Sequence, residues 1–187
     1  IMDRSKTGII AEFKRKSPSA GAINLNASVR QVTMGYAKSG ASGLSVLTDT
    51  PSFGGSLDDL LTARQYVQTP ILRKDFMLDE YQVYEATAFG ADAILLIAAM
   101  IDRYECEKLA GIAHKLGLEV LLEVHNESEI ASHAGEFADI IGVNSRDLKS
   151  FSTDLSQAEK LYELLPKDGI KIAESGIHQP EDAVRFR

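Results

Sequence analysis

The sequence has one cysteine and no long apolar run, and each scarcity excludes something. Because Cys106 has no second cysteine to pair with, neither an internal disulfide nor a cysteine-based metal cluster can form within these 187 residues. No apolar run approaches the roughly 20 residues that a membrane helix requires, and the opening stretch IMDRSKTG lacks the pattern of a signal peptide. We therefore expect a cytoplasmic protein with no membrane partner.

An excess of basic charge is also lacking, since 27 acidic residues outnumber 20 Lys and Arg and the formal net charge is −7. Affinity for nucleic acid comes from a basic face that neutralises phosphates, so a nucleic-acid partner is not expected. A small anionic ligand stays possible, because a few lysines can focus a positive field inside a cleft of an acidic protein.

Cofactor motifs are missing as well. Neither G-x-G-x-x-G nor G-x-x-x-x-G-K-[ST] occurs, which argues against the usual dinucleotide and nucleoside-triphosphate sites. The histidines are scattered, with His114 and His133 expected at solvent-facing helix positions and His125 near Glu123 as a lone candidate ligand. One such pair is weak support for a metal, and Cys106 in a helical segment is expected to pack, so we predict no metal and no cofactor.

The sequence does contain a regular alternation. Short runs rich in Ile, Val and Leu recur seven times: GIIAEFK, ASGLSVLTD, TPILRKD, ADAILLIAA, LEVLLEV, DIIGVNS and GIKIAES. Longer segments between them have apolar residues at helical spacing, and several end in a glycine that suits a helix C-terminus, namely Gly40, Gly90 and Gly117. Strand followed by helix predicts a parallel α/β sheet in one domain spanning residues 1–187.

The charges in the first strand distinguish between the two common parallel α/β architectures, the open doubly wound sheet and the closed barrel. Strands of an open doubly wound sheet are covered on both faces and stay apolar, whereas barrel strands open at their C-terminal ends into an active site. With period two, Ile10, Glu12 and Lys14 share one face, and Ala11 and Phe13 share the other. The pattern favours a (β/α)₈ TIM barrel with Glu12 and Lys14 at its mouth.

The same parity places one late polar residue or pair on each of four later strands: Lys74, Glu123, Asn144 with Arg146, and Glu174. A single charge at a strand end is most often solvated or half of an ordinary salt bridge. Together, however, these residues gather two lysines, an arginine and three carboxylates at one rim, which favours function over structure. Such a set can bind an anion and donate a proton to a carbonyl, and backbone N–H groups of the turn ESGI could hold a phosphate.

These motifs resemble the indole-3-glycerol-phosphate synthase family of tryptophan biosynthesis. The resemblance runs through almost the whole chain, in the stretches IAEFKRKSPSAG, FGG, PILRKDFMLDEYQ, GADAILLI, LLEVHNESE, IGVNSRDL and IAESGI. It implies a lyase that closes, decarboxylates and dehydrates 1-(2-carboxyphenylamino)-1-deoxyribulose 5-phosphate without a cofactor.

The resemblance also implies roles. Lys74 is similar to the general acid of ring closure, Lys14 to the lysine that meets the substrate carboxylate with Glu12 beside it, and Glu123 to the acid/base of dehydration. How the two lysines and Glu123 divide the steps stays open. The implied substrate-binding residues are Ser17, Phe53, Phe76, Asn144, Arg146, Leu148, Glu174, Ser175 and Gly176.

The sequence departs from the family pattern at both ends. It stops inside the expected seventh helix, so we expect strands one to seven to be present and the eighth β/α unit and the N-terminal extra helix to be missing. Two alternatives follow: a non-catalytic barrel fragment that binds phosphate ligands weakly, or a Schiff-base aldolase that uses Lys74 covalently. A glycosidase with Glu123 and Glu174 ranks last. The protein is expected to be a monomer, or to be fused to or associated with a neighbouring pathway enzyme.

Overall fold

The computed structural model describes residues 5–146 and 152–186, which form two compact units. Unit 1 comprises Ile1–Leu95 with Lys115–Leu118, and unit 2 comprises Leu96–His114 with Glu119–Arg187. Each unit is described by itself, and the expectation of one domain over residues 1–187 stays a prediction.

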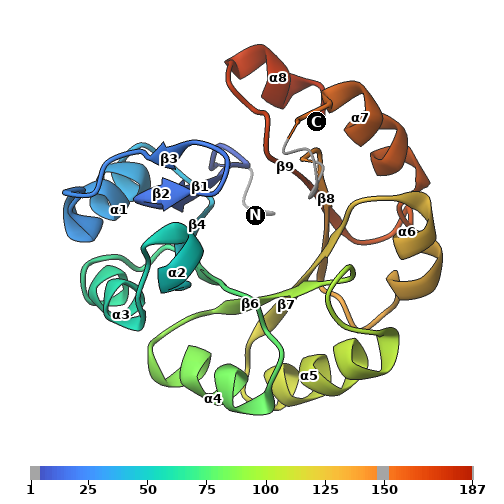
Figure 1. The fold of residues 1–187 in the computed structure, drawn as a ribbon, viewed down its shortest axis with the longest axis horizontal. Helices are drawn as coiled ribbons and strands as arrows, with labels where there is room; N and C mark the ends of the chain where they lie inside the picture. The colour runs from blue at the N-terminus through green and yellow to red at the C-terminus, as the bar shows by residue number, and fades with distance from the viewer. Residues whose placement is uncertain (1–4, 147–151, 187) are drawn as a thin grey trace. The chain divides into compact units, whose positions relative to one another are not determined.

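Unit 1 alternates strands and helices, as Figure 1 shows in blue to green. Its strands follow one another in the order β1-β4-β5-β6, and the pairs from β1 to β6 are parallel. Each new strand is added on the same side of the last, without the reversal of a doubly wound sheet. The elements are β1 (Ile10–Phe13), β2 (Lys16–Ser17), β3 (Gly21–Ala22), α1 (Val29–Lys38), β4 (Gly43–Leu47), α2 (Thr50–Phe53), α3 (Leu57–Tyr66), β5 (Ile71–Lys74), α4 (Glu80–Ala88) and β6 (Ala93–Ile97), whose last residues belong to unit 2.

Unit 2 continues the alternation, and its strands β7, β8 and β9 are parallel neighbours in chain order. The register sets Glu123 beside Gly142 and Asn144 beside Glu174, so their side chains can share a face. Figure 1 shows α6 and α7 on one side of these strands. The elements are α5 (Arg103–Lys115), β7 (Glu119–Val124), α6 (Glu127–His133), β8 (Ile140–Asn144), α7 (Leu155–Leu164), β9 (Ile170–Glu174) and α8 (Pro180–Val184).

The core of unit 1 confirms the predicted parity of the first strand. Phe13 is buried and Ala11 packs against the same apolar cluster, which also contains Leu44, Leu60 and Ile71. The helices that cover this face begin at side-chain caps: Ser28 of α1 and Ser56 of α3 each accept a hydrogen bond from a backbone N–H of the first turn. Residues of the other parity are therefore turned away from the helices.

All seven predicted strands are present, and so are helices in the segments with helical spacing between them. The glycines Gly40, Gly90 and Gly117 have positive φ angles after their helices, as predicted. Helix α6 was not predicted, although Asn126 and Glu129 make an N-cap pair there. Helix α2 and the short β2–β3 pair, whose apolar periodicity is too brief to register, were not predicted either.

One histidine prediction was wrong. His133 is buried, not solvent-facing, because its ring lies between the Ser132 hydroxyl, 2.8 Å from Nδ1, and the Ile101 carbonyl, 3.0 Å from Nε2. The prediction for Cys106 is confirmed, since the side chain is fully buried in α5. Burial, with Asp102 and Glu107 nearby, raises the pKa of the Cys106 thiol to about 11. No helix within residues 5–146 and 152–186 has the length and apolar content to cross a bilayer.

Candidate active site

The end of β1 carries an ion pair. Lys14 Nζ lies 2.5 Å from Glu12 Oε1, and the two side chains are 35% and 31% exposed. The Ser45 hydroxyl donates to Glu12 Oε2 at 3.4 Å from the neighbouring strand. Because the lysine is held at the strand end but not sealed from solvent, it can meet an anionic ligand there.

Lys74 ends β5 with the parity that the sequence predicts. Its neighbour Arg73 has the opposite parity and is 3% exposed, on the face of the buried Ile71. Arg73 donates to Asp75 at 3.0 Å and to the Gln82 carbonyl at 2.7 Å. This buried network fixes the strand on either side of Lys74, so the adjacent charges of Arg73 and Asp75 are structural.

Arg15 repeats this arrangement beside Lys14. Its guanidinium donates to both carboxylate oxygens of Asp59, at 2.5 and 2.8 Å, and lies over the Phe13 ring at 5.0 Å. The hydrogen bond to Asp59 raises the pKa of Arg15 against the effect of burial. The structural roles of Arg15 and Arg73 were not predicted, although each residue shares strand parity with a buried apolar neighbour.

Aromatic and small residues surround these strand ends. The rings of Phe53 and Phe76 are 6.3 Å apart and tilted by 45°, so the two predicted pocket residues do lie together. Ser17 accepts a hydrogen bond from the Ala20 backbone at 3.1 Å and holds the β2–β3 turn. In the FGG stretch, Gly55 allows a close backbone approach, since a Cβ there would lie 2.0 Å from the Leu47 carbonyl oxygen.

Glu123 is the most enclosed candidate in unit 2. It is a buried carboxylate at the end of β7, and Asn144 of β8 donates its amide to Glu123 Oε1 at 3.1 Å. Asn144 also accepts the Arg146 backbone N–H at 3.0 Å, so its amide orientation is set from both ends. The structure thus brings two predicted residues into direct contact.

His125 adds a contact that the sequence analysis did not use. Its Nε2 lies 3.1 Å from Glu123 Oε1 and its Nδ1 lies 3.2 Å from Glu129 Oε2, with the side chain 9% exposed. Burial lowers the pKa of His125, but the two carboxylates outweigh burial and the net pKa is raised. The distance between Nε2 and Glu123 Oε1 is that of an ion pair, but the geometry is not that of an ordinary hydrogen bond.

Glu174 ends β9, and its side chain lies over a glycine. A Cβ added to Gly142 would be 2.4 Å from Glu174 Oε1 and 3.2 Å from Ile172 Cγ1. Only a residue without a side chain lets the Glu174 carboxylate occupy this place beside β8. Gly142 has the strand parity of Asn144 but was not predicted as a site residue.

The turn after β9 has an unusual backbone. Ser175 is the one described non-glycine residue with positive φ, at 65°, and Gly176 follows at 69°. The Ser145 hydroxyl contacts the carbonyl oxygens of Glu174 and Ser175, at 3.1 and 3.0 Å, and so holds the turn. Strain of this kind persists where surrounding contacts enforce it, often at ligand sites.

Other predicted residues are placed less fully. Arg146 forms an isolated antiparallel bridge with Thr153. Leu148 lies outside the described residues. In the described part of the chain, no group of three or more His, Cys, Asp or Glu could hold a metal ion.

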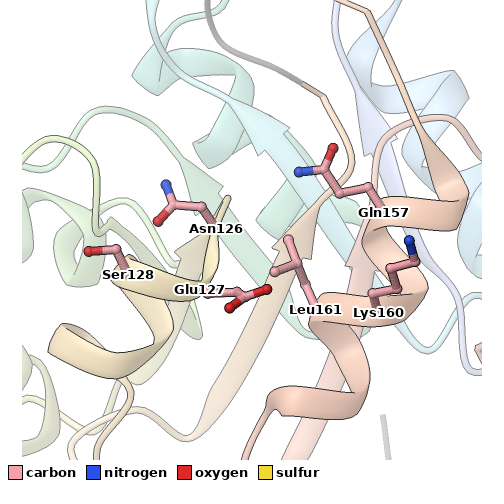
Figure 2. Close-up of a pocket in the computed structure, with 6 residues that line it drawn as sticks. All are labelled: Asn126, Glu127, Ser128, Gln157, Lys160 and Leu161. Carbon is pink, nitrogen blue, oxygen red and sulfur yellow. The ribbon is translucent and has the colours of Figure 1, made fainter.

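Two hollows occur elsewhere than at the predicted catalytic residues. One of about 350 Å³ lies between α6 and α7, where Figure 2 shows Glu127 extending toward Leu161. A second, of about 390 Å³, is lined in unit 1 by residues that include Thr50, Arg73 and Asp75. We give more weight to the strand ends, because the catalytic groups of the expected barrel come from the C-terminal ends of several strands, whereas Glu127 and Lys160 of the first hollow lie on helices.

Comparison with known proteins identifies relatives. The family model described as "Indole-3-glycerol phosphate synthase" matches residues 2–187. A protein of that name from Bacteroides thetaiotaomicron is 50% identical over 98% of this chain and 70% of its own length. Another from Hyphomonas neptunium is 48% identical over 100% of this chain and 71% of its own length.

A solved structure supports the fold. A mutant tryptophan synthase α-subunit from the hyperthermophile Pyrococcus furiosus superposes with a TM-score of 0.70 at 13% identity, covering 96% of this chain and 82% of that chain. This similarity and the parallel β/α order of each unit confirm the predicted (β/α)₈ barrel class. The described residues contain seven consecutive strands of the main sheet.

Proposed function

Since the chain belongs to the indole-3-glycerol phosphate synthase family, we propose how its own side chains carry out that family's reaction. The enzyme is a carboxy-lyase of tryptophan biosynthesis that acts on a small anionic substrate carrying a phosphate. The substrate, 1-(2-carboxyphenylamino)-1-deoxyribulose 5-phosphate, yields indole-3-glycerol phosphate, carbon dioxide and water.

Ring closure needs a proton at the ketone oxygen. As the aromatic carbon that bears the carboxylate attacks the ketone carbon, Lys74 donates a proton to the oxygen, which becomes a hydroxyl. Lys14 meets the substrate carboxylate, and Glu12 keeps the ammonium of Lys14 in place through their 2.5 Å contact. Loss of carbon dioxide then restores the aromatic ring. Preorganised ammonium groups can stabilise this charge without reorganising.

Dehydration needs a proton acceptor. The hydroxyl leaves as water after it takes a proton from a lysine, and Glu123 accepts the proton from the carbon next to the ring nitrogen, so that the indole double bond forms. Burial of Glu123 and its contact with Asn144 support this assignment, because an enclosed, oriented carboxylate is suited to proton transfer.

The remaining predicted residues bind and orient the substrate. The backbone N–H groups of Ser175 and Gly176 bind the phosphate. The ribulose portion is oriented by Glu174, Asn144 and Arg146. Ser17 supports the loop after β1. Phe53, Phe76 and Leu148 line the pocket of the aromatic ring, an assignment supported for the first two by their ring contact.

The observation that carries most of this proposal is the pair formed by Glu12 and Lys14, held half-exposed at the end of β1. We propose one catalytic domain over residues 1–187, which acts as a monomer or is fused to or associated with a neighbouring pathway enzyme. A cytoplasmic location is proposed because the pathway is biosynthetic and Cys106 is an unpaired thiol.

Replacement of Lys74 tests the proposal. The rise in fluorescence as the substrate becomes indole-3-glycerol phosphate gives kcat and KM directly. Loss of a general acid costs about 10²- to 10⁴-fold in rate, so Lys74→Ala should lose at least 100-fold in kcat. Lys108→Ala is the matched control, because Lys108 lies on the surface of α5 beside Glu105. Activity of Lys74→Ala within threefold of the parent would overturn the assigned role.

A further inference from the structure

His125 forms a buried link between two carboxylates that come from different elements. Glu123 lies next to the last residue of β7, and Glu129 belongs to the first turn of α6. The imidazole contacts both, at 3.1 Å through Nε2 and at 3.2 Å through Nδ1. A ring that is 9% exposed and faces a carboxylate at each nitrogen is suited to the doubly protonated, cationic form.

Glu129 is itself held in place. Its Oε2 accepts the His125 backbone N–H at 2.8 Å, and its Oε1 accepts the Asn126 side-chain amide at 2.6 Å. The carboxylate therefore fixes the imidazole from the helix side. On the strand side, Glu123 Oε1 receives the Asn144 amide at 3.1 Å and faces His125 Nε2.

The Nε2 atom is buried without a hydrogen bond of ordinary geometry. Contacts of catalytic groups are often long or poorly aligned before the ligand binds and tighten in the complex. A small rotation of Glu123 would align the contact. The ring is thus placed to respond to a change in the position or charge of Glu123.

We propose that His125 is a positioning residue for Glu123: anchored by Glu129, it orients Glu123 Oε1 and keeps this group as a carboxylate at the start of each turnover. The inference rests on the proposed role of Glu123 as proton acceptor. When Glu123 takes the proton from the substrate carbon, the facing imidazolium loses its counter-charge, which favours release of that proton from Glu123 to solvent after the indole double bond has formed and so restores the carboxylate.

The charges around the ring decide the pH behaviour. The carboxylates of Glu123 and Glu129 raise the pKa of His125, whereas its burial lowers it. From β8 the contacting residue is the uncharged Asn144, and from β9 the carboxylate of Glu174 lies over Gly142, the register partner of Glu123. By the same interaction, a cationic His125 favours the ionised form of Glu123.

The first experiment follows the imidazole itself. In an NMR titration of the whole protein, the ring protons of His125 should titrate above the usual value near 6.5. Glu129→Gln and Glu123→Gln should each lower that midpoint. The control is His114, which pairs with Asp139 at 2.8 Å on the surface and should not respond to either substitution. An unshifted His125 midpoint in both variants would overturn the link.

The second experiment is kinetic. His125→Gln retains a polar side chain but removes the charge, so the acidic limb of the kcat/KM profile should move up by about one pH unit, with KM changed less than twofold. The loss of kcat/KM should be about tenfold at pH values below the acidic limb of the parent, and it should disappear at pH values above the limb of the variant. His114→Gln should leave the profile unchanged.

The outcomes separate the two proposals. If His125→Gln is less stable but keeps the parent pH profile, His125 is only structural and the inference fails. Because that variant could fold poorly, Glu129→Gln provides a second test that leaves the imidazole in place, and it should shift the limb in the same direction. If Glu123→Gln stays active while the NMR coupling is present, the assigned role of Glu123 fails instead.

Discussion

Gly142→Ala offers a test of whether Glu174 must occupy its present position. The added Cβ would lie 2.4 Å from Glu174 Oε1, about 1 Å inside ordinary van der Waals contact. The atom it meets is the end of a flexible side chain, so the carboxylate can swing away. We expect this movement to displace Glu174 by about 1 Å from the orientation used in catalysis.

The magnitude follows from that displacement. A misplacement of about 1 Å can lower a rate by about 100-fold, or about 2.7 kcal/mol in activation free energy. Stability should change much less. An off-rotamer side chain costs about 1 kcal/mol, and replacing a strand glycine by alanine returns a similar amount. The free energy of unfolding should therefore stay within about 1 kcal/mol of the parent.

The assay combines kinetics with a double-mutant cycle. In the fluorescence assay, Gly142→Ala should lower kcat/KM about 100-fold, and in a Glu174→Ala background it should have almost no further effect. Gly111→Ala is the control, because Gly111 lies in α5 with open space where its Cβ would be. An equal loss from Gly142→Ala with and without Glu174 would refute the reasoning, since the effect would then not pass through that carboxylate.

Two further predictions concern stability. Asp59→Ala leaves the guanidinium of Arg15, 21% exposed, without its paired carboxylate and should lower the free energy of unfolding in urea by about 2 kcal/mol. The control Arg103→Ala, which breaks the exposed pair with Glu107, should lower it by less than about 0.5 kcal/mol. Equal losses in the two variants would contradict the expected difference between a buried and an exposed ion pair. The pKa of Cys106 in the folded protein, raised to about 11, lies above the value of about 8.5 in the unfolded chain. The protonated thiol therefore contributes its full stabilisation of the folded state below about pH 8.5, and this stabilisation is lost as the pH rises toward 11. Unfolding of the parent, compared with Cys106→Ala from pH 8 to 10.5, should therefore show the parent losing more stability, and parallel curves would exclude the effect.

The strand–helix order and the faces of the strands could be predicted from the sequence alone. Both are local: period two assigned Ala11 and Phe13 to the core and Glu12 to the other face, and the structure agrees. The same rule placed Glu123 and Asn144 at neighbouring strand ends, where they are in contact. Recognition of the family depended on motifs that are likewise short and contiguous.

Which polar groups pair with one another could be seen only in the folded protein. Arg73 is buried against Asp75 and Gln82, although the strand pattern alone expects an apolar residue there. His133, expected at the surface, is buried because α6 turns it toward the Ile101 carbonyl. Such partners depend on how helices pack on the sheet, which no local periodicity records.

The roles of Gly142 and His125 likewise depend on contacts with residues that are distant in the sequence or on another element. Gly142 is required because β9 brings Glu174 over it, and the two residues are 32 positions apart in the chain. His125 matters because a short helix, too brief to predict, returns Glu129 to the ring that faces Glu123. The strand pattern in the sequence places the polar residues at the strand ends. Contacts between residues far apart in the sequence then determine the orientation and the protonation state of each side chain.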